Sequence, residues 1–128
     1  MRVARLADYK KFEFSNSDII EPNDGECLLK VKVVSVCGTD IRREFNKKWN
    51  SESYPQRDGM PCHEVVGEIY RSKSKLFKEG DRVLAVPTSD NGLQEYLTLP
   101  EDRFLKLPDY GDYEDYDCFY LYDKICNY

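Results

Sequence analysis

At 128 residues, the chain is long enough for about one domain with a single hydrophobic core. It carries 24 acidic and 19 basic side chains, a formal net charge of -5, and no stretch basic enough to follow a phosphate backbone, which argues against nucleic acid as a partner. No apolar run approaches the roughly 18 residues of a membrane span, and the N-terminal residues lack the apolar core of a secretory signal, so we expect a cytoplasmic protein without a membrane partner.

Short strands separated by turns are predicted along most of the chain. Valine and lysine alternate over residues 27–36, which is typical of a strand with one buried face, and the turn at 22–26 precedes it. Residues 40–45 lack this alternation and predict one helical turn. The strands are expected at residues 2–8, 12–15, 27–36, 64–70, 82–86, 93–99 and 103–107. This spacing predicts a mainly-β fold, either a small barrel or a sandwich.

The composition changes from residue 109 onward, where tyrosines and acidic residues dominate. Tyr113, Tyr116 and Tyr120 have helical spacing, and Asp112 could cap such a helix at its N-terminus. We therefore expect residues 109–128 to form a segment distinct from the domain at 1–108. It is either a short amphipathic helix or an acidic, tyrosine-rich tail.

The five cysteines are odd in number and unevenly spaced, at positions 27, 37, 62, 118 and 126. A disulfide framework would require pairs in a small secreted chain, so we interpret them as reduced thiols. In a reducing compartment, a cysteine near a histidine motif is more plausibly a metal ligand than half of a disulfide.

Two short motifs carry the chemistry: Cys37-Gly38-Thr39-Asp40 and Cys62-His63-Glu64. Thiol, imidazole and carboxylate are ligand types that zinc prefers when one coordination position stays open. Taken singly, Cys37 would be interpreted as a small buried hydrophobe and His63 as an ordinary surface or core residue. However, His63 is the chain's single histidine, and Glu64 enters an apolar strand, which is costly unless the carboxylate is paired or metal-bound.

The order of these and later motifs resembles that of the zinc-dependent alcohol dehydrogenases. This medium-chain dehydrogenase/reductase family, including its sorbitol and threonine dehydrogenase types, carries the same five motifs in the same order. They are Cys-Gly-Thr-Asp, His-Glu-x-x-Gly-x-Ile, Gly-Asp-Arg-Val, Gly-Leu-Gln-Glu-Tyr and Leu-Pro-Asp. The resemblance covers about residues 1–110, the family's N-terminal GroES-like segment. It implies a mainly-β, GroES-like, partly open β-barrel with one or two short helices.

The resemblance also implies a site for a catalytic zinc ion. Cys37 and His63 match the first two zinc ligands, and Glu64 matches the glutamate that ligates zinc or swings toward it. Thr39 matches the residue that hydrogen-bonds the substrate hydroxyl, and Asp40 matches the carboxylate that orients the ligand histidine. Zinc in such a site acts as a Lewis acid on an alcohol or carbonyl substrate.

The sequence departs from the family pattern at three places within the barrel. Cys62 stands where the family usually has glycine, and it is either an extra thiol near the metal or a space-filling side chain. Residues 87–91 contain no cysteine, so the four-cysteine structural zinc lobe of many members is absent. Arg42 stands where some members carry a relay histidine, which implies a shorter proton path.

The last departure is at the C-terminal end. The chain has no Gly-x-Gly-x-x-Gly and no room for the family's nucleotide-binding Rossmann domain, so it resembles that enzyme's zinc domain as a piece or a shortened gene product. NAD(P) would bind only if a Rossmann domain is supplied elsewhere. The protein partners that we expect are a protein with a Rossmann domain or a second copy of this chain in a homodimer. Residues 121–126 fall near the expected position of the last zinc ligand, and Asp123 or Cys126 could serve, with Asp123 included in our ligand set.

Three functions remain open at this point. The first is an alcohol-dehydrogenase-like oxidoreductase domain that polarises a small-molecule alcohol or carbonyl, inactive by itself without a nucleotide-binding domain. The second is a non-catalytic, free-standing module that binds zinc or a small ligand. The third, an interaction protein in the manner of a co-chaperonin, gives no role to Cys37, His63 and Glu64 together.

Overall fold

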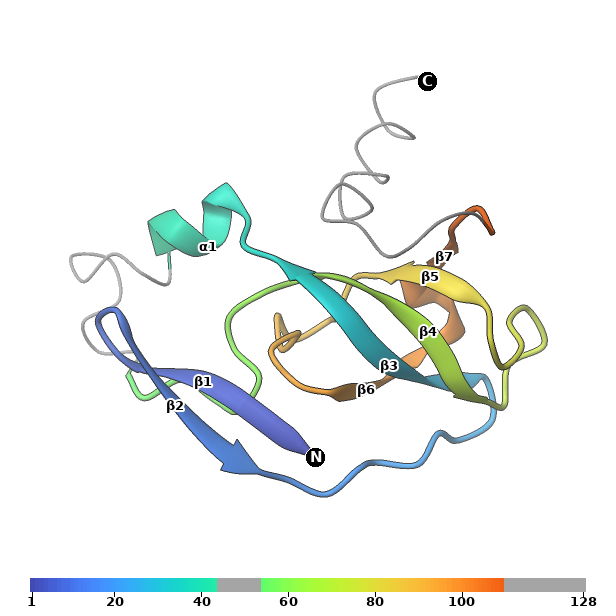
Figure 1. Cartoon of the computed structure of the whole chain (residues 1–128), viewed down its shortest axis with the longest axis horizontal. Coiled ribbons are helices and arrows are strands. Elements are labelled where there is room, and N and C mark those ends of the chain that lie inside the picture. The colour runs from blue at the N-terminus through green and yellow to red at the C-terminus, as the bar shows by residue number, and fades with distance from the viewer. Residues whose placement is uncertain (44–53, 110–128) are drawn as a thin grey trace.

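The fold is mainly β, as predicted. The computed structural model describes residues 1–43 and 54–109 (Figure 1). Its elements, in chain order, are β1 (Arg2–Asp8), β2 (Lys11–Asn16), β3 (Glu26–Ser35), α1 (Gly38–Arg43), β4 (Glu64–Ser72), β5 (Arg82–Ala85), β6 (Tyr96–Pro100), the 3-10 helix η1 (Glu101–Arg103) and β7 (Phe104–Lys106).

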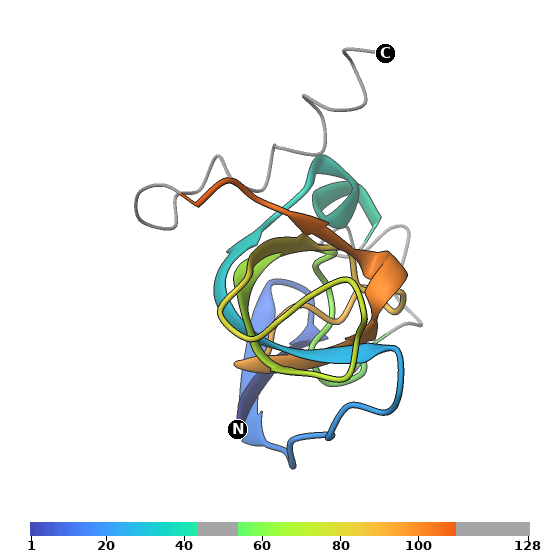
Figure 2. The ribbon, with the colours of Figure 1, turned by 90° about the vertical axis from the view of Figure 1, so that its right-hand side faces the viewer.

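Five of these strands form a single antiparallel sheet in the order β6-β3-β4-β5-β7. Its two edge strands, β6 and β7, are joined only by η1. An extended chain from Pro100 to Phe104 spans at most about 14 Å, whereas the edges of a flat five-stranded sheet would lie about 19 Å apart. The sheet must therefore curl around its core, as Figure 2 shows. Because β6 and β7 do not pair with each other within the described residues, the barrel is partly open, as expected.

The core of the barrel is built by the inward-facing positions of the alternating strands. Its side chains are almost completely buried, and Phe77 packs against them from the β4–β5 connection. Burial of this apolar surface is the main favourable contribution to folding. The buried members are Cys27, Leu29, Val65, Ile69, Val83, Ala85, Leu97, Leu99 and Phe104.

Strands β3 and β4 approach each other closely at Gly67. Gly67 pairs with Val31, next to a register irregularity between Val31 and Val33. A Cβ atom on Gly67 would lie 2.2 Å from the Lys30 carbonyl oxygen, so no other residue type fits there without movement of the backbone. A glycine in a strand next to a bulge commonly marks such an approach.

The hairpin of β1 and β2 forms a separate two-stranded sheet, seen on the left in Figure 1. The other edge of β1 bonds to two loops: Ala4 N–H donates to the Leu93 carbonyl at 2.8 Å, and Gly59 N–H donates to the Ala4 carbonyl at 2.8 Å. Strand β1 thereby holds the loop before β4 and the loop before β6 next to each other.

Some predicted boundaries shift in the structure. Strand β6 begins at Tyr96, whereas the sequence predicts 93, because Leu93 N–H bonds to the Gly59 carbonyl and Gln94 N–H bonds to the Gly92 carbonyl. Helix α1 begins at Gly38, two residues before the predicted helical turn. Of the segment predicted at 109–128, residues 110–128 lie outside the described residues. Among residues 1–43 and 54–109, none of the helices has the length and apolar character that crossing a bilayer requires.

Asp81 ties the turn before β5 to β7. Its buried carboxylate accepts hydrogen bonds from Lys78 N–H at 3.0 Å and from Lys106 Nζ at 2.9 Å. Burial works to raise the pKa of Asp81, but the Lys78 hydrogen bond and the Lys106 ammonium outweigh it, so this pKa is lowered. A carboxylate whose folded pKa is lowered stabilises the fold above its unfolded pKa, and this stabilisation is lost as the pH falls toward the folded pKa.

We therefore expect Asp81→Asn to lower the free energy of unfolding by about 1.5 kcal/mol at neutral pH, since a charged hydrogen bond is lost. The deficit should shrink as the pH falls below about 4, where the wild-type carboxylate also becomes protonated. Urea denaturation across this pH range measures both effects. Asp81→Asn in a Lys106→Gln background provides the control, because there the ion pair is already absent. A deficit that is the same at every pH would contradict the assigned role.

Candidate metal centre

Cys37 lies at the junction between β3 and α1. Its carbonyl accepts the first helical hydrogen bond, from Ile41 N–H at 3.2 Å, which makes Cys37 the N-cap residue of α1. The Asp40 carboxylate reaches back and accepts the Cys37 N–H at 2.9 Å, as an acidic residue at the third helical position does in a capping box. The thiol is therefore fixed at the start of a short helical turn, directly after the strand that the sequence predicts at 27–36.

The surroundings of the Cys37 thiol lower its pKa and so favour the thiolate. Hydrogen bonds from the Thr39 hydroxyl and from Thr39 N–H lower the pKa of the Cys37 thiol. Burial and the nearby Glu64 carboxylate oppose this shift without cancelling it. The thiolate is the form of cysteine that binds metals, so this environment favours metal binding.

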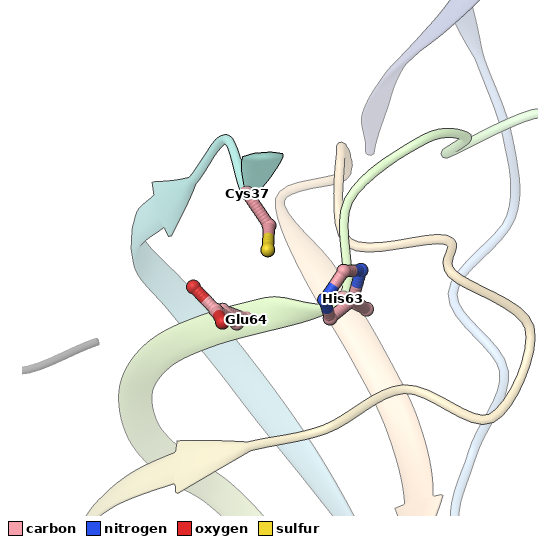
Figure 3. A group of neighbouring side chains, drawn as sticks. All are labelled: Cys37, His63 and Glu64. Atoms are coloured by element: carbon pink, nitrogen blue, oxygen red, sulfur yellow. The ribbon is translucent and has the colours of Figure 1, made fainter. Parts of the chain in front are cut away.

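The register of the sheet brings His63 and Glu64 to Cys37. Strands β3 and β4 are antiparallel, and Ser35 pairs with Glu64, so the end of β3 meets the start of β4. Cys37 follows Ser35 by two residues and therefore lies across from His63 and Glu64. Figure 3 shows the three side chains close together, with the Cys37 sulfur pointing toward the segment that carries His63 and Glu64. Their ligand atoms, one from each residue, all lie within 4.8 Å of one another.

Asp40 also holds the imidazole of His63. Its Oδ1 lies 3.3 Å from His63 Nδ1, so Nε2 is the ring nitrogen left for the Cys37 side or for a metal ion. Burial works to lower the pKa of His63, but the Asp40 carboxylate and a hydrogen bond with Cys37 outweigh it and raise this pKa. Burial also raises the pKa of Asp40 itself. One buried carboxylate thus fixes the backbone of the thiol residue and the orientation of the imidazole.

The donor set fits zinc. Sulfur, nitrogen and oxygen ligands bind this ion at about 2.0–2.3 Å, so two ligands of a tetrahedral site lie about 3.5 Å apart. The three side chains would need to close by only about 1 Å from their present separation. Across the described ranges, this is the one group of three or more His, Cys, Asp or Glu side chains close enough to hold a metal ion.

The other residues that the sequence predicts near the metal differ in where they lie relative to the site. Thr39 lies beside the sulfur, where its hydroxyl bonds to Cys37. Cys62 is fully buried, and burial raises its pKa to about 12, which keeps it a protonated thiol and favours the space-filling interpretation over that of an extra ligand. Asp123 and Cys126 lie outside the described residues, so the last ligand stays a prediction.

One neighbour of the site, Asp90, is not predicted from the sequence. Asp90, in the loop between β5 and β6, has its Oδ1 3.9 Å from His63 Nδ1. Neither its spacing nor any motif distinguishes it from other loop acids, because its proximity depends on the pairing of distant segments.

Three comparisons relate this chain to known proteins. Residues 23–109 match the family model of the alcohol dehydrogenase GroES-like domain. The chain is 33% identical to L-galactonate-5-dehydrogenase of Escherichia coli (strain K12), over 82% of this chain and 38% of that protein. It is 30% identical to an NAD-dependent alcohol dehydrogenase of Sulfolobus acidocaldarius, over 71% of this chain and 28% of that protein.

Among solved structures, S. aureus TarJ in complex with NADPH superposes with a TM-score of 0.64 and 29% identity, over 87% of this chain and 34% of that one. This chain thus spans less than half the length of these relatives. Since the matched family model covers more than half of the sequence, the chain belongs to the alcohol dehydrogenase GroES-like domain family of medium-chain dehydrogenases/reductases.

Proposed function

We propose that this chain is the zinc-holding, substrate-polarising part of an oxidoreductase that acts on a small-molecule alcohol or carbonyl. The observation that supports the proposal is the convergence of Cys37, His63 and Glu64, with their ligand atoms within 4.8 Å of one another. Asp40 supports it further, because Asp40 bonds to the His63 nitrogen that a metal would not use. Zinc bound there would supply Lewis-acid chemistry, lowering the pKa of an alcohol or polarising a carbonyl.

The residues of the chain divide the work around that ion. Cys37, His63 and Glu64 bind it, and Asp40 keeps the imidazole in the tautomer with hydrogen on Nδ1. Thr39 binds the substrate hydroxyl. Both the N–H and the hydroxyl of Thr39 donate hydrogen bonds to the Cys37 sulfur. The hydroxyl can therefore turn toward a substrate while the N–H keeps its hydrogen bond to the sulfur. Asp123 is proposed as a further ligand.

The hydride acceptor is proposed to be a nicotinamide cofactor held outside residues 1–109. This rests on the relatives, one of which is an NAD-dependent alcohol dehydrogenase and another a structure with NADPH. A Rossmann domain on another part of the assembly would bind this cofactor. A non-catalytic zinc module is the alternative, and nicotinamide binding separates the two functions.

Metal analysis of the purified chain is the first test. We expect close to one zinc per chain, and less than about 0.1 would count against both the enzyme and the zinc-module interpretations, because three protein ligands normally retain catalytic zinc. Titration with NAD(H) and NADP(H) is the second test. Retained zinc without nicotinamide binding, even with a candidate Rossmann partner added, would favour the non-catalytic module.

Zinc affinity should rise with pH. The His63 pKa is raised, so a proton occupies the imidazole to a higher pH than usual, and it must leave before zinc binds. The lowered Cys37 pKa makes the thiol proton easier to displace. Below both pKa values, zinc binding should release about two protons, and the affinity should increase by up to about 100-fold per pH unit. Competition with a chelator between about pH 6 and pH 8 measures this dependence, and a pH-independent affinity would contradict the ligand assignment.

A further inference from the structure

A second carboxylate faces the same imidazole nitrogen as Asp40. Asp90 Oδ1 lies 3.9 Å from His63 Nδ1, and Asp40 Oδ1 lies 3.3 Å from it. The Nδ1 atom has one hydrogen to donate, and Asp40, the nearer residue, takes the better position. At 3.9 Å, Asp90 acts mainly through its negative charge, which favours a hydrogen on Nδ1 and a cation nearby.

The loop that carries Asp90 is firmly tied to the residues around His63. Gly92 N–H donates to the Cys62 carbonyl at 2.9 Å, and Leu93 N–H donates to the Gly59 carbonyl at 2.8 Å. A Cβ on Gly92 would lie 2.6 Å from Val65 Cγ2 and 2.9 Å from the Cys62 oxygen, so this contact requires glycine. Asp90 is thus two residues from a point where the loop packs directly against the residue preceding His63.

The backbone at Asp90 adds to this picture. Its φ of 51° lies in the left-handed region, which most side chains avoid and which asparagine, aspartate and glycine tolerate best. The Asp90 side chain is 47% exposed, so it is not held in place by packing in the core.

We propose that Asp90 is a second positioning residue for His63, which together with Asp40 holds the imidazole with Nδ1–H toward the carboxylates and Nε2 toward Cys37. Its charge also strengthens the attraction of the site for a divalent cation. The effect on affinity rests on the proposed zinc site. The effect on the imidazole does not, because the ring already faces both carboxylates without a metal.

The left-handed backbone conformation at position 90 limits the substitutions that can test this role. Asp90→Asn removes the charge and keeps the size and the tolerance for the left-handed conformation. Asp90→Gly suits the same conformation and removes the side chain, so that no amide can interact with Nδ1. Asp18→Asn, at an exposed position, is the control for the loss of one negative charge. Asp40→Asn is the positive reference.

Two measurements on the full chain test the proposal. Because His63 is the single histidine, the imidazole nitrogen signals in an NMR spectrum report its tautomer without assignment of other residues. In the metal-free chain, at a pH where the ring is neutral, we expect mainly the Nδ1–H tautomer. The fraction of the Nε2–H tautomer should at least double in both Asp90 variants, rise further in Asp40→Asn, and stay unchanged in Asp18→Asn.

The second measurement is zinc affinity by chelator competition. We expect a loss of about tenfold in the Asp90 variants, the low end of the effect of residues behind a metal ligand. A wild-type tautomer in both Asp90 variants would overturn the proposal, whatever the affinity. If wild-type protein binds no zinc, the proposed function fails, but the tautomer shift in the metal-free chain still supports the role of Asp90.

Discussion

Cys37→Ser should reduce the zinc bound per chain at least tenfold. Of the cysteines in the described ranges, Cys37 is the one whose sulfur groups with the ligand atoms of His63 and Glu64, and hydrogen bonds from Thr39 favour its thiolate. A serine hydroxyl remains protonated near neutral pH and is a poor zinc ligand by comparison. Changes behind the ligands alone typically cost 10 to 100-fold in affinity, so loss of a ligand should cost at least the lower of these values.

The matched control is Cys62→Ala, which removes a sulfur one residue from His63. Cys62 is fully buried with a pKa of about 12, so it is not expected to contribute a thiolate. We expect this variant to keep its zinc, although loss of a buried side chain lowers its stability. Metal content after gel filtration, with circular dichroism to confirm folding, measures both variants. Full zinc content in folded Cys37→Ser would refute the assignment of this ligand.

Gly67→Ala should have the largest effect on stability. The new methyl group would lie 2.2 Å from the Lys30 carbonyl oxygen and 3.0 Å from Leu29 Cδ1, and the first of these neighbours is backbone in the adjacent strand. Strands β3 and β4 would have to separate at this point of close approach. We expect a loss of about 3 kcal/mol in the free energy of unfolding, at the upper end of the usual cost of overpacking.

Gly38→Ala provides the comparison for this variant. No atom lies within 4 Å of a Cβ placed on Gly38, and this residue begins helix α1. An alanine there should change the stability by less than about 0.5 kcal/mol, as at most surface positions. Urea denaturation of both variants measures the difference. Equal stabilities would mean that β3 and β4 do not approach as closely as the structure shows.

Much of the fold could be predicted from the sequence, because alternating side chains report directly on a half-buried strand. The alternation of valine and lysine located β3, and turn residues located its start. The start of β6 could not be predicted, since apolar residues near 93 follow a strand-like pattern but bond to Gly59 and Gly92 in a loop. The connection of the two edge strands by η1 likewise depends on strand order, which a single sequence does not encode locally.

The candidate site shows the same division. Residue types and motif order identified Cys37, His63 and Glu64 as candidate ligands, and the structure brings these three together. What brings them together is the pairing of Ser35 with Glu64, a long-range register that the sequence does not display. No motif identifies Asp90 for a related reason, because its position next to His63 depends on the close contacts of Gly92 with Val65 and Cys62 in a distant segment.

X-ray absorption at the zinc edge of the zinc-loaded chain tests the central claim most directly, because it identifies the atoms around the ion. We expect one sulfur at about 2.3 Å and the other ligands to be nitrogen or oxygen at about 2.0–2.2 Å. The sulfur contribution should disappear in Cys37→Ser and remain in Cys62→Ala. A zinc ion surrounded only by nitrogen and oxygen in the wild-type chain would contradict the account.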